Sequence, residues 1–220
     1  MKTVKFYYVR HGQTEHNLNR RSQGWCDSPL TAKGLEEVRE AGRLLKDVHF
    51  DRAYVSSLKR CVDTAAIVLK DRNVPVKYLD GLREINFGQY EATYVVNASE
   101  EFLRRRAIMD WKDVGGENLQ MLEERIMKTY QQIYDECNDG DNVLIISHGT
   151  VFLNMIHFMF GYDISEYRRL CNDNDTILPV PNGFAAVFSH DEGGYHLLQL
   201  VGRDKSVLEE LNRIKDQVRT

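Results

Sequence analysis

The chain has 220 residues, of which 42% are hydrophobic and 28% are charged, and its formal net charge is −4. This length suffices for one domain with a large buried core, and the composition is ordinary for a globular protein. The slightly acidic balance excludes the broad basic surface that binds nucleic-acid strands, so we expect no nucleic-acid partner. A local arginine cluster would still allow a small anionic substrate.

The cysteines and the apolar runs indicate where such a protein resides. The four cysteines are widely separated and form no Cys-x-x-Cys pair, so we expect free thiols in a reducing compartment. The first residues do not show a signal-peptide pattern, and no apolar run approaches the roughly 20 residues that cross a bilayer. The sequence therefore predicts a cytoplasmic protein with no membrane partner.

The first half of the chain alternates strands and helices. β-Branched and aromatic runs predict strands at 4–9, 53–56 and 76–78. A polar loop follows the first strand, and Thr31 is a good N-cap for a helix that ends near Lys46. A second helix is expected at 58–69, because its apolar residues fall on one stripe. Asp80-Gly81 is expected to be a turn.

The second half begins with a stretch, 86–116, that shows little pattern beyond a helix near 100–109. After it, residues spaced by three and four predict an amphipathic helix, and an aliphatic run predicts a buried strand. Two β-rich runs flank Asp191-Glu192-Gly193-Gly194, which is typical of a hairpin. The expected elements are helices at 119–137, 149–160 and 205–218, a strand at 142–147, and hairpin strands at 184–188 and 195–200.

These elements predict an α/β fold with three layers. A mostly parallel central sheet is flanked by helices, and a C-terminal hairpin is added to it. With no repeat or linker in the sequence, we expect a single domain over 1–220. The helix at 205–218 is more typical of a docked core helix than of a dimer arm, and a homodimer stays open.

Three of the expected strands run into charged or imidazole-bearing residues. The first runs into Arg10-His11-Gly12, and the strand at 142–147 ends in Ser147-His148-Gly149. The second ends in Ser56-Ser57, with Arg60 in the first turn of the next helix. Because ligands of parallel α/β sheets bind beyond the carboxyl ends of the strands, we expect these segments to meet in one crevice.

The residue types at this edge favour a tetrahedral oxyanion. Helical side chains lean toward the helix N-terminus, so Arg60 should project over the sheet edge. Arg10 and Arg60 can each hold phosphate oxygens in a forked contact. The helix N-termini would add unpaired N–H groups and partial positive charge. Gly12 and Gly149 would let the backbone approach the ligand closely.

The same residues suggest covalent phosphoryl transfer. His11, as a neutral imidazole between two arginines, can act as the nucleophile toward phosphorus. Arg10, Arg60 and a protonated His148 could supply the fixed positive charge that the transferring group needs. A leaving alkoxide also needs a proton, and Glu84 is the best candidate acid if burial or nearby anionic charge raises its pKa.

Five separated motifs resemble the histidine phosphatase (phosphoglycerate mutase-like) superfamily, in its phosphatase branch. They occur in the family's order and span about residues 4 to 202. The motifs are Arg10-His11-Gly12-Gln13-Thr14 with Asn17, the run 23–31 with Gly34, Ser56-Ser57-Leu58-Lys59-Arg60 with Thr64-Ala65, Leu82-Arg83-Glu84 with Phe87-Gly88, and Ser147-His148-Gly149.

The resemblance implies that His11 is phosphorylated and that Glu84 is the proton donor. Arg10, Arg60 and His148 would form the phosphate pocket, and further ligand contacts would come from Asn17 and Gln23. It also implies a metal-independent reaction without a cofactor. One departure is Tyr90-Glu91-Ala92, where the family often has an aromatic residue, Glu and Gly. This departure bears on the shape of the adjoining substrate loop.

Three functions are compatible with these residues. The first is a phosphomonoester hydrolase that acts on a small phosphorylated metabolite through a phosphohistidine intermediate. The second is a phosphoglycerate mutase, which returns the phosphoryl group to an organic acceptor. Such mutases generally carry a longer insertion between the acid and the second histidine, so the short stretch from Glu84 to His148 favours the hydrolase. The third, a non-catalytic phospho-ligand binding protein, should have lost the nucleophile or the acid, and both are present.

The substrate itself is not defined by the sequence. Sugar phosphates, phosphoglycerates, nucleotides and phosphopeptides all stay open. Selectivity is expected to come from residues 86–116 and 172–182. Within the first stretch, Arg104-Arg105-Arg106 fits either a substrate clamp or, more typically, a charged helix face.

Overall fold

A six-stranded sheet organises the computed structural model, which describes residues 2–171 and 179–218. The strand order within this part of the chain is β3-β2-β4-β1-β5-β6, with β3, β2, β4 and β1 parallel and the β5-β6 hairpin antiparallel. The strands are β1 (Val4–Arg10), β2 (Arg52–Ser56), β3 (Val76–Leu79), β4 (Asn142–Ser147), β5 (Ala185–Asp191) and β6 (Gly194–Val201).

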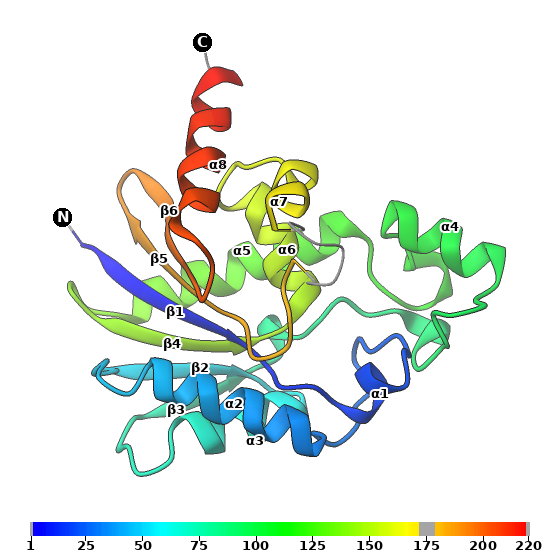
Figure 1. Cartoon of the computed structure of the whole chain (residues 1–220), viewed down its shortest axis with the longest axis horizontal. Helices are drawn as coiled ribbons and strands as arrows, with labels where there is room; N and C mark the ends of the chain where they lie inside the picture. The colour runs from blue at the N-terminus through cyan, green and yellow to red at the C-terminus, as the bar shows by residue number, and fades with distance from the viewer. Residues whose placement is uncertain (1, 172–178, 219–220) are drawn as a thin grey trace.

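Helices cover both faces of this sheet (Figure 1). On one face lie α2 (Ala32–Leu44) and α3 (Lys59–Val68). The other face is covered by α5 (Leu119–Glu136), α6 (Gly149–Phe158), α7 (Ile164–Cys171) and α8 (Lys205–Val218). The short α1 (Glu15–Leu18) and α4 (Glu100–Ile108) lie beyond the carboxyl end of β1. The predicted three-layer α/β fold with a mostly parallel sheet and a C-terminal hairpin is therefore confirmed.

Strand alternation divides the buried side chains between two cores. Tyr8 of β1 belongs to the larger core, which it shares with residues of α5 and α6. The next residue, Val9, belongs to the smaller core with residues of α2 and α3. Successive side chains of a strand point to opposite faces, so β1 and β4 must be apolar on both sides. This two-sided burial fixes the register that places the strand ends.

The long connections differ most from the sequence-based expectation. The predicted polar loop after β1 contains α1, in which Thr14 and Asn17 form a capping box. Helix α7 was not predicted, and the expected turn at Asp80-Gly81 is a 3₁₀ turn, Asp80–Leu82. Two further 3₁₀ turns, Gly88–Tyr90 and Lys112–Val114, lie in the stretch that showed little pattern. Elements this short contain too few residues for a hydrophobic repeat to be recognised, so periodicity does not reveal them.

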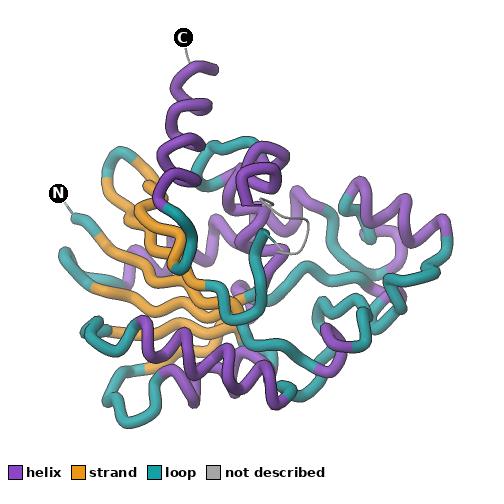
Figure 2. The backbone as a smooth tube through the Cα atoms, viewed as in Figure 1, coloured by secondary structure: helices purple, strands orange, loops and turns teal. Residues whose placement is uncertain are grey.

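Figure 2 shows how much of the connecting chain gathers at one end of the sheet.

The four cysteines are free thiols, as predicted. In the described part of the chain, no helix combines the length and apolar character that spanning a bilayer requires.

Gly34 in α2 allows the loop after β1 to lie directly on this helix. A Cβ atom at Gly34 would lie 2.0 Å from the backbone oxygen of Gln13, whereas one at Gly42 of the same helix would find Val68 Cα at 3.7 Å as its nearest neighbour. We predict that Gly34→Ala lowers the free energy of unfolding by about 3 kcal/mol, because backbone must move. Gly42→Ala should instead raise it by up to about 1 kcal/mol through helix propensity. Urea unfolding of both variants measures the difference; equal effects would contradict this packing.

Candidate active site

The parallel pairing of β1 and β4 brings two histidines together. Arg10 is in register with Ser147, so His11 and His148 follow adjacent strand ends. The backbone N–H of His11 donates to Ser147 O at 3.2 Å, and the two imidazole centroids are 5.2 Å apart. Both rings are buried, with relative exposures of 3% for His11 and 0% for His148. The expected meeting of these segments is thus present in the structure.

Arg60 lies between the two imidazoles. It is the second residue of α3, as predicted, and its guanidinium is fully buried. Its Nε donates to His11 Nε2 at 3.3 Å, and its Nη2 donates to His148 Nδ1 at 3.2 Å. The remaining N–H groups donate to the carbonyls of Gly24 and Cys26 and to the Asp27 carboxylate. A single buried cation therefore orients both histidines.

These contacts define the tautomer of His11. Its Nδ1 lies 2.8 Å from the carbonyl oxygen of Gly12, which only accepts hydrogen bonds. Nδ1 therefore carries the proton, and Nε2 carries the lone pair that faces Arg60. Burial, followed by the positive charge of Arg60 and of Arg10, holds the pKa of His11 well below 6.5. His11 is thus a neutral imidazole with a free electron pair on Nε2.

His148 is neutral as well, which corrects the expectation of a protonated imidazole. A guanidinium only donates, so Nδ1 of His148 accepts from Arg60 and Nε2 donates to Ser56 Oγ at 2.7 Å. Burial and the charge of Arg60 hold its pKa well below 6.5. A cation beside a desolvated imidazole disfavours the second charge. Arg60 and Arg10 are therefore the cations of the ligand-free site.

Glu84 has the properties expected of a proton donor. Its carboxyl group is buried, and burial raises its pKa above 4.5, although Arg60 and Arg10 act in the opposite direction. Oε1 accepts from the N–H of Ile85 at 2.9 Å, and Oε2 accepts from the N–H of Thr150 at 3.0 Å. Glu84 thus lies at the start of α6, close to the chain segment that carries His148.

The two helix N-termini are capped by protein carboxylates, contrary to the expectation of unpaired N–H groups. Asp27 accepts from the N–H groups of Lys59 and Arg60 at the start of α3. Glu84 does the same for Thr150 at the start of α6. Because these N–H groups already have protein acceptors, the unpartnered Nε of Arg10 is the clearest donor left for an anion.

Gly12 and Gly149 make space for other groups of the protein, whereas we expected them to let the backbone approach the ligand. A Cβ at Gly12 would lie 2.3 Å from Gly34 O, so Gly12 permits contact with α2. A Cβ at Gly149 would lie 2.9 Å from Arg10 Nε, so Gly149 makes space for that guanidinium. Arg10 donates to the carbonyl of Val180, and its buried Nε has no hydrogen-bond partner. An unsatisfied buried donor of this kind suits an anionic ligand.

Asn17 and Gln23 lie at the edge of the site, and both line the cleft described next. The Asn17 side-chain oxygen accepts from the Thr14 N–H and from Asn182. Gln23 accepts from the Thr14 hydroxyl at 2.6 Å and donates to Ser28 at 3.1 Å. Their side chains tie the loop after β1 to the following segment.

A cleft of about 500 Å³ opens over these groups. Of the predicted site residues, Arg10, Asn17, Gln23, Glu84 and Gly149 line it, whereas His11, Arg60 and His148 are not among its lining residues. The described residues that line it are Arg10, Asn17, Arg21, Ser22, Gln23, Glu84, Phe87, Val95, Phe102, Arg106, Met109, Gly149, Thr150, Leu153, Arg168, Pro179 and Val180. Of the predicted selectivity segments, part of 86–116 and residues 179 and 180 are here; residues 172–178 lie outside the described chain.

The departure at Tyr90-Glu91-Ala92 leaves the adjoining loop well defined. The Glu91 carboxylate accepts from the N–H groups of Gly24, Trp25, Cys26 and Phe87. Ala92 has φ of 57°, a left-handed conformation that glycine adopts at lower cost. The alanine therefore strains the backbone at this position of the loop.

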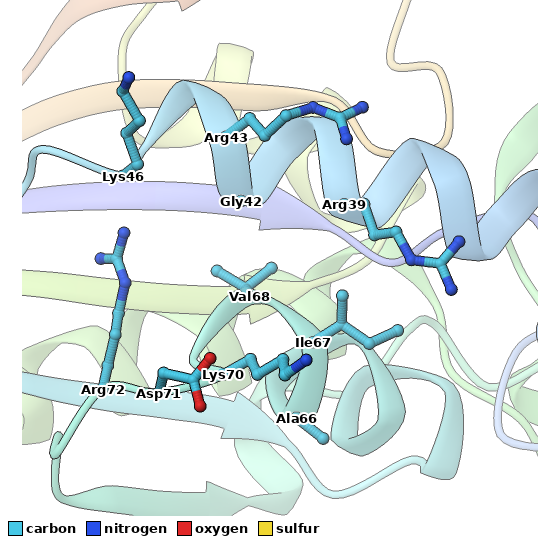
Figure 3. A pocket seen from close by; sticks show the side chains of 10 residues that line it. All are labelled: Arg39, Gly42, Arg43, Lys46, Ala66, Ile67, Val68, Lys70, Asp71 and Arg72. Carbon is cyan, nitrogen blue, oxygen red and sulfur yellow. The ribbon is translucent and has the colours of Figure 1, made fainter.

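A second hollow, of about 690 Å³, lies between α2 and α3 (Figure 3). Its lining includes the cations Arg39, Arg43, Lys46, Lys70 and Arg72. Among the described residues that line it, none is a histidine or cysteine, so it offers no imidazole or thiol nucleophile. Over residues 2–171 and 179–218, no group of three or more His, Cys, Asp or Glu side chains is placed to hold a metal ion.

Several residues that position the histidines were not singled out from the sequence. The Tyr8 hydroxyl donates to His148 O and accepts from His148 N. Ser147 Oγ donates to Leu82 O at 2.8 Å, which ties the end of β4 to the segment of Glu84. Ser56 and Asp27 lie inside two of the five sequence motifs, so those motifs could have indicated that both residues belong to the site. In the sequence, Tyr8 resembles any core residue of a strand, and its hydrogen bonds to the His148 backbone can be recognised only in the fold.

Comparison with known proteins identifies relatives of two named activities. A profile of the Histidine phosphatase superfamily (branch 1) matches residues 6–181. The 2,3-bisphosphoglycerate-dependent phosphoglycerate mutase of Cytophaga hutchinsonii is 36% identical over 150 residues, 64% of this chain and 70% of that protein. A broad-specificity phosphatase of Saccharomyces cerevisiae is 31% identical over 183 residues, 80% of this chain and 79% of that protein. The phosphoglycerate mutase structure from Bacillus anthracis matches with a TM-score of 0.74 at 30% identity, covering 96% of this chain and 97% of that chain.

The neutral histidines predict a pH-dependent stability. Folding lowers both pKa values from 6.5, so below that pH the native state binds fewer protons than the unfolded state. Stability should therefore fall as the pH falls below about 6.5, by up to about 1.4 kcal/mol per pH unit for each histidine. We expect His148→Gln to reduce this slope in urea unfolding between about pH 5 and pH 7. The exposed His49 is the control, since His49→Gln should retain the wild-type slope. An unchanged slope in His148→Gln would refute the neutral imidazole.

Proposed function

This chain belongs to the histidine phosphatase superfamily, and from that premise we propose that it hydrolyses phosphomonoesters of small metabolites through a phosphohistidine intermediate. One observation carries the proposal. Nε2 of His11 keeps its lone pair and faces the guanidinium of Arg60, and the preceding residue, Arg10, lines a cleft together with a buried Glu84 whose pKa is raised by burial. Nucleophile, fixed charge and proton donor are therefore available together.

In the first step, the lone pair of His11 Nε2 forms a bond to phosphorus, and the bond from phosphorus to the ester oxygen breaks. The Glu84 carboxyl proton passes to the departing oxygen, so an alcohol leaves and Glu84 becomes a carboxylate. Arg60 and the otherwise unpartnered Nε of Arg10 stabilise the charge on the transferring oxygens. Negative charge near His148 would raise the pKa of this imidazole and favour its protonation during the step.

In the second step, the Glu84 carboxylate accepts a proton from water as the water oxygen attacks phosphorus. The bond between phosphorus and Nε2 breaks, its electron pair returns to His11, and inorganic phosphate leaves. Glu84 is protonated again, so the site is restored. The Nδ1–H donated to Gly12 O stabilises positive charge on the ring while the phosphoryl group is attached.

A phosphoglycerate mutase is the second candidate, since relatives at 36% and 30% identity carry that name. A mutase shares the first step, and the acceptor in the second step is then an organic hydroxyl group. The two are separated by incubating the protein with 3-phosphoglycerate and measuring both free phosphate and 2-phosphoglycerate. Release of phosphate supports the hydrolase, whereas isomerisation without release supports the mutase.

Replacement of the nucleophile tests the covalent step. We predict that His11→Ala lowers turnover of p-nitrophenyl phosphate by at least about 10³-fold, because no other neutral imidazole faces Arg60 Nε. Rapid quenching of the wild-type protein with a ³²P-labelled substrate should yield an acid-labile, base-stable label on the peptide that contains His11. A label on another peptide, or undiminished turnover by His11→Ala, would remove the assignment.

Replacement of the acid tests proton donation separately. We predict that Glu84→Gln slows phosphoryl transfer from alkyl phosphates by about 10²- to 10⁴-fold, because an alkoxide leaves poorly without a proton. p-Nitrophenolate needs little protonation, so single-turnover transfer from p-nitrophenyl phosphate should fall much less. Rapid-quench measurement of the labelled enzyme gives both rates. Equal losses with the two leaving groups would show that Glu84 does not donate the proton.

A further inference from the structure

The cleft lined by Arg10 and Glu84 carries more positive charge than one phosphoryl group uses. Four arginines line it, and Glu84 is the sole acidic residue among its described lining residues. Arg10 lies near the imidazoles and belongs with Arg60 to the pocket of the proposed function. Arg106 and Arg168 come from two other helices, α4 and α7, and have no role in that pocket.

The arginines of α4 differ in how they are neutralised. Arg104 forms an ion pair with Glu101 at 2.9 Å. The buried Arg105 pairs with Glu101 at 2.7 Å and with Asp113. Arg106 is exposed on the cleft and has no ion pair or side-chain hydrogen bond with any described residue. Arg104 and Arg105 therefore belong to a charged helix face, whereas Arg106 is available to bind a ligand.

The same division recurs on α7. Arg169 pairs with Glu166 at 2.7 Å, one turn earlier on the helix. Its neighbour Arg168 lines the cleft, is exposed, and has no acidic partner among the described residues. On each of the two helices, arginines that pair with acidic residues thus lie next to one arginine that lines the cleft and has no acidic partner among the described residues.

Exposed arginines on the other described helices pair with acidic residues instead. Arg39, Arg43 and Arg213 all pair with glutamates three residues earlier on their own helices. Unpaired cations that line a concave surface raise its potential and attract anions more than isolated surface charges do. The positive charge of Arg106 and Arg168 is consequently a specific feature of this cleft and not a general feature of the helix surfaces.

The cleft wall that accompanies these arginines is apolar. Phe87, Phe102, Met109 and Leu153 line it. An apolar wall binds an apolar body, and guanidiniums at the same cleft bind carboxylate or phosphate in forked contacts. A volume of about 500 Å³ lies within the range of sites for ring-containing small molecules.

We propose that the substrate is a phosphomonoester with an apolar, ring-sized body and a second anionic group, which Arg106 and Arg168 bind. This inference rests on the proposed function and assigns the two arginines as specificity-determining residues. This second group can be a carboxylate or a phosphate, because both present anionic oxygens that a guanidinium binds in a forked contact. The second anion raises affinity without taking part in the bond changes at phosphorus.

A matched substrate series tests the proposal. The substrates are 4-(carboxymethyl)phenyl phosphate, its neutral carbamoylmethyl analogue and its phosphonomethyl analogue, in which the methylene group insulates the leaving oxygen from the charge. We expect the wild type to have a kcat/KM at least about tenfold higher for an anionic substrate than for the amide, expressed mainly in KM. Comparison of the carboxylate with the phosphonate identifies the preferred anion.

Variants then locate the preference. In Arg106→Gln and Arg168→Gln the anion-to-amide ratio should fall severalfold, and in the double variant it should approach one. Arg104→Gln, on the same helix but paired with Glu101, should keep the wild-type ratio. Calorimetric binding of benzylphosphonate and 4-carboxybenzylphosphonate reports the same ratio without turnover, so a slow variant is still measured.

The outcomes separate this inference from the proposed function. A wild type that hydrolyses aryl phosphates with His11 but shows no anion preference overturns the inference alone. A preference that survives in the double variant also overturns it. If no aryl phosphate is hydrolysed and no phosphohistidine forms, the proposed function fails, and this inference fails with it.

Discussion

The structure of this site depends on one buried cation. The guanidinium of Arg60 uses its N–H groups on two imidazoles, two carbonyls and one carboxylate, and water has almost no access to it. A buried charge is tolerated only when its hydrogen bonds are satisfied and a counter-charge is near. Asp27 supplies the counter-charge and also caps the helix that carries Arg60. The same arrangement keeps His11 and His148 neutral, so the stability of the cation and the reactivity of the nucleophile have one physical origin.

The sheet explains why residues so distant in sequence meet around that cation. β1 and β4 are adjacent and parallel, and β2 pairs with β4, so three strand ends share an edge. The loops beyond that edge are fixed by single carboxylates that accept several N–H groups: Glu91 holds the loop after α1, and Glu117 accepts from Asn86 and Arg125. Each of these loops is therefore held by one carboxylate acceptor.

Most of the fold and the inner site were predictable from the sequence, and the reasons are specific. Long apolar runs such as 142–147 and the stripe of α5 repeat often enough to be recognised, and short motifs at strand ends mark His11, Arg60 and His148. The short helix α1 and the 3₁₀ turns depend on capping and distant contacts, which leave no period in the sequence. The charge of His148 in the folded protein could not be predicted from the sequence, because it depends on which atom of Arg60 faces the ring. The ion pairs that distinguish Arg106 from Arg104 and Arg105 likewise require coordinates.

The central claim is that Arg60 holds two neutral imidazoles in opposite tautomers. Long-range ¹H–¹⁵N correlation spectra of the ¹⁵N-histidine-labelled protein at about pH 6, assigned with His11→Gln and His148→Gln, measure this directly. We expect a neutral ring protonated on Nδ1 for His11 and a neutral ring protonated on Nε2 for His148. An imidazolium signal for either residue at that pH, or the reverse tautomer for His11, would contradict it.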